Sequence, residues 1–173
     1  MADDDADRPG TIWESRGVLR WGVRESLRSY VEGLPGGEIR VLDGAERLSS
    51  GGFGFPLTSA LADHRVGDLD EPLDFGGAVR FTGYNGLLRF EIAHPRLERD
   101  GDSVVLSVSD NLDETLAERI PFGSSLASSI WMTGPTRRTA KAVKLTGAGA
   151  ALLGDVYPEG SMLDPWTLTL FTD

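Results

Sequence analysis

Few side chains in this sequence have the chemistry to hold a metal ion or a cofactor. The chain contains three tyrosines, two histidines and no cysteine. The absence of cysteine excludes disulfides, thiolate nucleophiles, zinc–thiolate sites and iron–sulfur clusters. His64 and His94 are too few for a three-histidine metal site. The three tyrosines are the remaining side chains to consider one by one.

No spacing in the sequence is typical of hydrolytic catalysis. A Ser/His/Asp set can be drawn from either histidine, but no nucleophile elbow accompanies it. The acidic residues Asp110, Asp113 and Glu114 are spaced like a solvated surface, and no carboxylate pair is singled out for glycosidase chemistry. Ser49–Gly54 is rich in glycine but lacks the lysine of a phosphate loop, which favours a strand with close backbone approach.

Tyr30 lies in Leu19–Leu34, which the spacing of apolar residues predicts to be one amphipathic helix ending before Pro35-Gly36-Gly37. The predicted apolar stripe contains Val23, Leu27, Tyr30, Val31 and Leu34, with Arg24, Glu25, Arg28 and Glu32 on the other side. Ser26 lies one turn before Tyr30 on this stripe. The phenol is thus expected to face inward, either as a core residue with a satisfied hydroxyl or as a ligand for something held against the helix.

The other two tyrosines lie in turns. Tyr84 belongs to Gly83-Tyr84-Asn85-Gly86, and Asn-Gly is a strong hairpin signal. Taken alone, Tyr84 is an exposed aromatic residue at a hairpin tip. Tyr157 precedes Pro158 in a second turn and is expected to be a packing residue.

The remaining sequence predicts short strands separated by turn signals. Alternating apolar residues indicate strands over 38–42, 75–82, 88–92, 104–108, 141–145 and 166–170. Thr146 is expected to cap a short helix over 148–153 that ends at Gly154. The fold class is therefore mainly β, an antiparallel β-sandwich of about nine or ten strands, with one N-terminal helix and a short helix near the C-terminus.

Length and charge limit the organisation and the partners. The 173 residues suit one domain over 11–173, preceded by a disordered acidic leader over 1–10 that contains four aspartates. A formal net charge of −10 argues against binding nucleic acid or an anionic membrane surface. An anionic small ligand stays open, because a few arginines can make a local positive pocket. The sequence as written shows no export signal and predicts a cytoplasmic protein; a trimmed chain of a secreted or cell-surface protein would look the same.

Four stretches resemble, in order, the HtaA-type haem-binding domain known from secreted and surface-attached haem-uptake proteins of Gram-positive bacteria. They are WGVRESLRSYV (21–31), GAVRFTGYNGLLRFEIAHPRLE (77–98), LTGAGAALLG (145–154) and YPEGSMLDPWTLTL (157–170). The resemblance covers about residues 17–171. It implies a mostly β domain of packed antiparallel sheets with short helices, in agreement with the strand pattern.

The resemblance also implies roles for individual residues. Tyr30 matches the tyrosine that is the axial ligand of haem iron in this family, so the expected cofactor is haem b with ferric iron. Tyr84 stands where the family has a histidine in a Phe-Thr-Gly-His stretch; its hydroxyl can support the Tyr30 phenolate or ligate iron itself. Ser26, together with Arg24 or Arg28, would supply donors for the haem propionates.

Three functions follow from the resemblance, and the sequence leaves all three open. The first is haem binding for transfer, carriage or storage, with Tyr30 as metal ligand. The second is a cytoplasmic haem-dependent enzyme on the same fold, and the third is a domain that has lost haem and serves as an interaction module. The expected partners are haem and either a second copy, forming a homodimer, or a protein that exchanges haem with this one.

Overall fold

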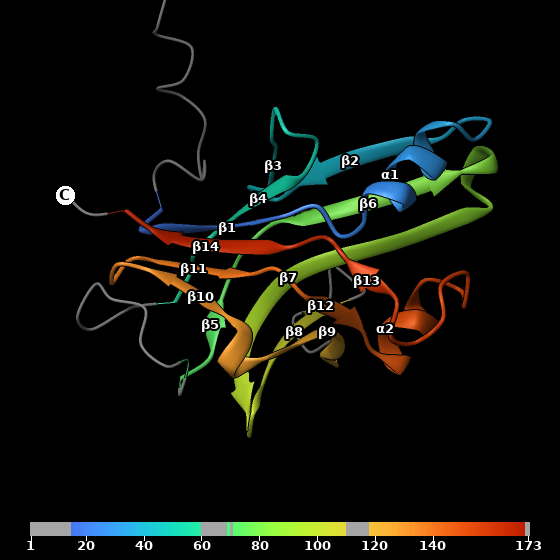
Figure 1. Ribbon diagram of the computed structural model, residues 1–173. Helices are drawn as coiled ribbons and strands as arrows, with labels where there is room; N and C mark the ends of the chain where they lie inside the picture. Colours follow the sequence, from blue (N-terminus) through green and yellow to red (C-terminus); the bar gives the residue numbers. More distant parts are fainter. Residues whose placement is uncertain (1–14, 60–68, 70, 110–117, 172–173) are drawn as a thin grey trace, which may run out of the picture.

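Two antiparallel sheets form the protein, as the alternating sequence pattern predicts (Figure 1). The computed structural model describes residues 15–59, 69, 71–109 and 118–171. The predicted leader, His64 and the acidic residues 110–114 lie outside the described residues.

The six-stranded sheet has the order β10 (Trp131–Thr133), β11 (Arg137–Ala140), β14 (Trp166–Leu170), β1 (Gly17–Trp21), β4 (Phe53–Pro56) and β3 (Glu46–Arg47). The eight-stranded sheet has the order β13 (Met162–Leu163), β12 (Val143–Leu145), β9 (Ile120–Leu126), β8 (Ser103–Ser109), β7 (Leu88–Asp100), β6 (Ala78–Gly83) and β2 (Glu38–Leu42), and β5 (Leu73–Asp74) pairs with β7. The described residues thus form more strands than expected, because two-residue strands such as β3, β5 and β13 are too short to show alternation.

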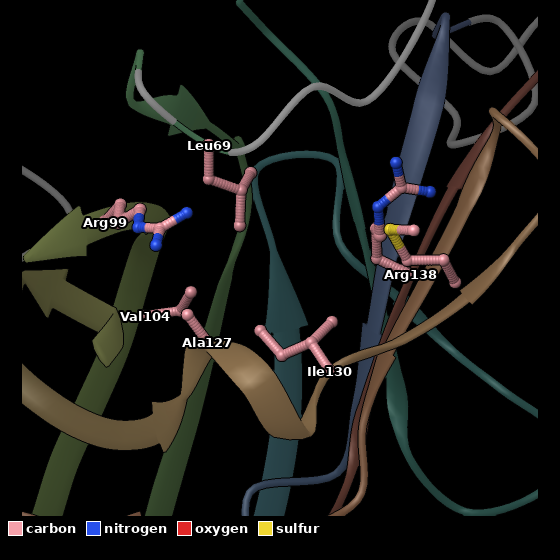
Figure 2. A pocket seen from close by; sticks show the side chains of 7 residues that line it. Leu69, Arg99, Val104, Ala127, Ile130 and Arg138 are labelled. Carbon is pink, nitrogen blue, oxygen red and sulfur yellow. The ribbon is translucent and has the colours of Figure 1, made fainter. Parts of the chain in front are cut away.

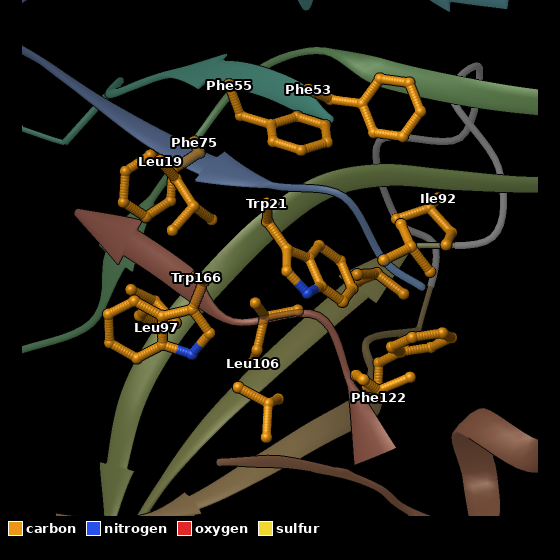
Figure 3. Packing of buried hydrophobic residues seen from close by; sticks show 14 of the residues in the cluster. Leu19, Trp21, Phe53, Phe55, Phe75, Ile92, Leu97, Leu106, Phe122 and Trp166 are labelled. Carbon is orange, nitrogen blue, oxygen red and sulfur yellow. The ribbon is translucent and has the colours of Figure 1, made fainter. Parts of the chain in front are cut away.

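Aromatic side chains fill the space between the sheets (Figure 3). Trp21 on β1 meets Phe122 on β9 edge-to-face, with ring centroids 5.5 Å apart, and so joins the two sheets. Phe53 meets Phe81 in the same way at 6.2 Å. Such pairs add to the free energy of burying the rings. The core therefore fixes β1, and with it the start of the segment that carries Tyr30.

The helix predicted over Leu19–Leu34 is shorter than expected. Leu19 and Trp21 belong to β1, and helix α1 runs over Glu25–Glu32. Between them Val23 has a positive φ of 66°, which no helix accommodates. Leu19 and Trp21 alternate with Arg20, which is a strand pattern. The prediction extended the helical spacing of the following residues over them and so placed them in the helix.

Arg28 was expected on the solvent side of the helix, and this was wrong. Its side chain is buried, and Nη1 donates to the Gly22 carbonyl at 2.6 Å and to Asp164 Oδ2 at 2.5 Å. Asp164 lies between β13 and β14, and its Oδ1 accepts from the backbone N–H of Glu25 at 3.0 Å. Arg24, at the N-cap position, supplies no side-chain cap. The Asp164 carboxylate therefore caps α1 from the far end of the chain and neutralises the buried guanidinium.

Other local predictions are confirmed. Thr146 caps helix α2 (Gly147–Leu152), accepting from the Gly149 N–H at 2.9 Å. Pro95 lies inside β7, which continues through it with a register shift between Ala93 and Arg96. The Arg119 side chain donates to the His94 carbonyl in this bulge, which satisfies a backbone group that the ladder leaves unpaired.

Within the residues that the structure describes, no helix combines the length and the apolar character needed to cross a membrane.

Replacing Asp164 by alanine is expected to lower the free energy of unfolding by about 2–3 kcal/mol. The change leaves Arg28 buried without its carboxylate and removes the cap of α1. Urea unfolding followed by far-ultraviolet circular dichroism measures the loss. Glu38→Ala is the control, because Glu38 and Arg40 form an ion pair exposed to solvent and its removal should cost less than about 0.5 kcal/mol. Equal losses in the two variants would contradict a structural role for Asp164.

Candidate functional site

All three tyrosines of the chain meet on one surface. Tyr30 comes from α1, Tyr84 from the 3-10 turn η2 (Tyr84–Gly86) between β6 and β7, and Tyr157 from the loop after α2. Tyr84 and Tyr157 lie near enough to Tyr30 to raise the pKa of its phenol, with Tyr84 having the larger effect. The Tyr157 hydroxyl is 3.3 Å from Ser26 Oγ. We call these four residues the tyrosine surface; Figure 1 shows α1, the β6–β7 connection and α2 at the same end of the molecule.

The predicted inward orientation of Tyr30 was wrong, since the side chain is 47% exposed. Leu27, Arg28 and Val31 form the buried face of α1. Successive helical residues are about 100° apart, which places Tyr30 about 100° from the middle of that face. Ser26 precedes Tyr30 by four residues and shares its side of the helix, as expected.

The β6–β7 hairpin brings Tyr84 to α1. The expected hairpin is present, with Gly83 paired to Leu88 across a four-residue loop. Tyr84 and Asn85 both have positive φ, of 50° and 56°. The backbone N–H of Tyr84 donates to the carbonyl of Pro35, just after α1, at 2.8 Å. This bond ties the hairpin tip to the end of the helix.

Close packing beneath the tip explains one of its glycines. A Cβ at Gly83 would lie 2.7 Å from Leu34 Cδ1. Leu34 follows α1, so a side chain at Gly83 would push the hairpin away from the helix. Glycine at this position therefore helps to keep Tyr84 within reach of Tyr30.

The neighbours of Tyr30 raise the pKa of its phenol. The hydrogen bond with Tyr84 is the largest cause of a raised pKa at Tyr30, followed by the charge of an ionised Tyr84, partial desolvation and Tyr157. Two phenolates this close repel each other, so the pair gives up a second proton only at higher pH.

Arg24 holds the Tyr157 side of the surface in place. Its Nε donates to Ser26 Oγ at 2.8 Å, and its Nη1 donates to the Met162 carbonyl at 2.7 Å. The guanidinium lies 4.3 Å from the centroid of the Tyr157 ring. Tyr157 packs against the core as expected, but it also joins the surface through its hydroxyl. Of the two arginines expected to serve propionates, only Arg24 is at the surface, because Arg28 is buried on Asp164.

Exposed apolar side chains belong to the same segments. Leu87 follows η2, Val156 precedes Tyr157, and Met162 carries the carbonyl that Arg24 binds. Among the described residues, no group of three or more His, Asp or Glu side chains could hold a metal ion.

Local sequence patterns could not have found the whole surface. Tyr157 and Met162 meet α1 only through the fold, and Arg24 looked like an ordinary solvated charge. The sequence offered one signal. The chain has only three tyrosines, and all three lie together in the fold, so treating them as one group would have included Tyr157.

These observations define a class of protein: an antiparallel β-sandwich whose phenol groups lie on the outer side of a short N-terminal helix. The HtaA family model matches residues 16–169. The chain therefore belongs to the HtaA family.

Solved structures agree on the fold. The C-terminal domain of HtaA from Corynebacterium glutamicum has a TM-score of 0.67 and 22% identity, covering 90% of this chain and 96% of that one. The N-terminal domain of the same protein has a TM-score of 0.64 and 24% identity, covering 91% and 98%. Heme binding protein HtaB from Corynebacterium glutamicum has a TM-score of 0.65 and 22% identity, covering 90% and 92%. The comparison with curated protein sequences found no match.

Replacing Tyr84 by phenylalanine is expected to lower the pKa of Tyr30 toward the ordinary phenol value of about 10. The variant removes both the hydrogen bond and the charge that raise the pKa. The pH dependence of the tyrosine ring carbon signals in an NMR spectrum measures the change, and three tyrosines make the signals assignable. Tyr157→Phe should lower the pKa of Tyr30 less, because Tyr157 acts only through its charge. A pKa of Tyr30 that does not move in Tyr84→Phe would show that the two phenols are not coupled.

Proposed function

We propose that this protein binds haem b with ferric iron through the phenolate of Tyr30 and acts in haem carriage, transfer or storage. The observation that carries the proposal is the convergence of all three tyrosines: Tyr84 and Tyr157 both act on Tyr30, and the Tyr157 hydroxyl reaches Ser26 on the same helix. The family assignment supports it, as does the likeness to a protein described as heme binding.

The chemistry of the donors fits this cofactor. A phenolate is a hard anionic ligand that favours ferric iron, and tyrosine is among the known axial ligands of haem. Tyr30 is exposed, so a planar group can approach its hydroxyl. Leu87, Val156 and Met162 offer apolar contacts to a macrocycle. Arg24 and Ser26 offer donors to carboxylate substituents.

Tyr84 would act by holding a proton. In the free protein Tyr84 raises the pKa of Tyr30, which disfavours the Tyr30 phenolate. With haem bound, Tyr30 would give up its proton and hold the iron as a phenolate, and Tyr84 would donate its hydroxyl to the Tyr30 oxygen. A neutral phenol stabilises that anion less than a protonated imidazole would, which is the group that the family resemblance implies at this position. This difference would weaken retention of haem and suits a protein that passes haem to a partner, either another protein or a second copy.

Replacing Tyr30 by phenylalanine is expected to weaken binding of ferric haem by more than about 100-fold, because loss of even an outer-shell partner of a metal ligand typically costs 10–100-fold. Titration of haem into the protein, followed by the Soret and charge-transfer absorption bands, measures the affinity. Tyr157→Phe is the matched control, since it removes a neighbouring phenol and should keep the spectrum of tyrosinate-ligated haem. The absence of a saturating band near one equivalent would refute haem binding. Unchanged binding by Tyr30→Phe would refute the ligand assignment.

Replacing Tyr84 by histidine is expected to tighten haem binding about tenfold, because an imidazolium supports the Tyr30 phenolate more strongly than a phenol does. Dissociation constants from the same titration test this. Asn85→His is the control: it places an imidazole one residue along the same loop, where the positive φ is also tolerated. Equal or weaker affinity in Tyr84→His would show that position 84 does not support the ligand.

A further inference from the structure

A pocket of about 340 Å³ opens where strands β9 and β12 separate. The two strands pair at two positions, Ser124 with Lys144 and Gly123 with Leu145. Past Ser124 their pairing ends, and the turn η3 (Ala127–Ser129) follows β9. Leu126, Ala142 and Lys144 line the opening together with four serines: Ser103, Ser124, Ser125 and Ser129. None of these residues belongs to the tyrosine surface.

The volume of this pocket suits a small organic molecule. Pockets that bind such molecules typically measure about 300–1,000 Å³. A second opening, beside Val104, Ala127 and Ile130, measures about 60 Å³ and is too small for one (Figure 2). The two openings share no lining residue. We therefore consider the chemistry of the serine-lined pocket alone.

Ser125 offers this pocket a hydroxyl that is not used elsewhere. The residue is only 4% exposed, and its Oγ has no hydrogen-bond partner among the described residues. A buried polar atom without a partner is rare in native proteins, because it has lost its hydrogen bonds to water. Since Ser125 lines the pocket, an oxygen atom of a bound molecule can supply the missing partner.

Lys144 offers the pocket a positive charge. Its direct pairing with Ser124 places the two side chains on the same face of the sheet. Lys144 is exposed and takes part in none of the ion pairs found among the described residues. The other lysine of the chain, Lys141, has its Nζ 3.6 Å from the centroid of the Trp131 ring. Lys144 is thus the lysine available to a ligand.

The chain is locally positive around the pocket, although its formal net charge is −10. No acidic residue occurs between Glu118 and Asp155, the stretch that forms β9 through α2. The basic residues of the same stretch are Arg119, Arg137, Arg138, Lys141 and Lys144. A concentration of one sign of charge raises the local concentration of ligands of the opposite sign. An anionic ligand is therefore favoured over a neutral or a cationic one.

We propose that this pocket binds a small phosphate monoester whose carbon chain carries hydroxyl groups. The phosphate oxygens accept from the Lys144 ammonium and from the hydroxyls of Ser124 and Ser125. A phosphate group has three strong acceptor oxygens, which suit several separate donors. Lysine binds phosphate as a point charge, whereas the planar carboxylate matches the fork of an arginine best.

The remaining lining residues suit the rest of such a molecule. Ser129 Oγ donates to the Leu126 carbonyl at 2.7 Å, which leaves its lone pairs to accept from a ligand hydroxyl. The hydroxyl of Ser103 lies at the same opening, and Leu126 and Ala142 offer apolar contacts to carbon atoms. The pocket thus has a partner for each part of a phosphorylated polyol.

The two lysines provide a spectroscopic test on the whole protein without haem, so its outcome is independent of the tyrosine surface. In protein labelled with carbon-13 at lysine Cε, the Lys141 signal is recognised by its absence in Lys141→Gln. Glycerol 3-phosphate should shift the Lys144 signal saturably, with a dissociation constant on the order of 1 mM. The Lys141 signal should move little, because its ammonium stays on Trp131. Glycerol should give no saturable shift, and inorganic phosphate and glycerate should bind about tenfold more weakly than glycerol 3-phosphate.

Variants assign the binding to named side chains, with the backbone amide signals of Ser129 and Ala142 as the readout. Lys144→Gln and Ser125→Ala should each weaken binding of glycerol 3-phosphate about tenfold, the effect of losing a charge-assisted hydrogen bond. Lys141→Gln is the matched control: it removes the same charge three residues away and should change binding less than about twofold. Ser125→Ala should keep the urea midpoint of the unaltered protein, because its hydroxyl makes no hydrogen bond within the described part of the chain.

Several outcomes would overturn the proposal. One is a Lys144 signal that does not saturate with glycerol 3-phosphate. Another is equal binding of glycerol, inorganic phosphate or glycerate, which would show that the pocket does not select a phosphate monoester. Unchanged binding in both Lys144→Gln and Ser125→Ala would show that the ligand lies elsewhere.

Discussion

The arrangement at the tyrosine surface depends on Asp164. Its side chain accepts from the first N–H of α1 and from Arg28, its backbone N–H donates to the Val23 carbonyl at 2.9 Å, and its carbonyl accepts from Trp21 Nε1 at 3.1 Å. Helix α1 has only two turns, and helices this short are unstable by themselves in water. One residue near the C-terminus therefore fixes where α1 begins and how it is oriented.

The same contact decides which side chains face solvent. Arg28 must turn inward to reach Asp164, and Leu27 and Val31 turn inward with it. The helical geometry then leaves Ser26 and Tyr30 on the outer side. Tyr84 reaches Tyr30 because its N–H binds the Pro35 carbonyl directly after the helix. A shift of α1 would therefore separate the two phenols and not merely loosen the helix.

Sequence patterns predicted the elements that local chemistry determines. The β2 alternation, the Asn-Gly hairpin, the Thr146 cap and the β14 alternation all appear as expected, because each depends on residues close together in the chain. The orientation of α1 was mispredicted because a charged Arg28 reads as a surface residue. Its partner is 136 positions away, and no local pattern reports such a contact. The resemblance to HtaA domains singled out Tyr30 and Tyr84, whereas Tyr157 and Arg24 joined the surface only once the fold was known.

Core-facing arginines occur in two settings, and the difference between them is informative. Arg28 has a carboxylate and a backbone carbonyl in contact, so its burial is compensated within the chain and its role is structural. Arg99 stands at the end of the β7 row that contains Leu97, but it is exposed to solvent and donates to the Gly101 carbonyl, so water compensates its charge. A guanidinium at the edge of a core retains its charge and needs either water or an anion.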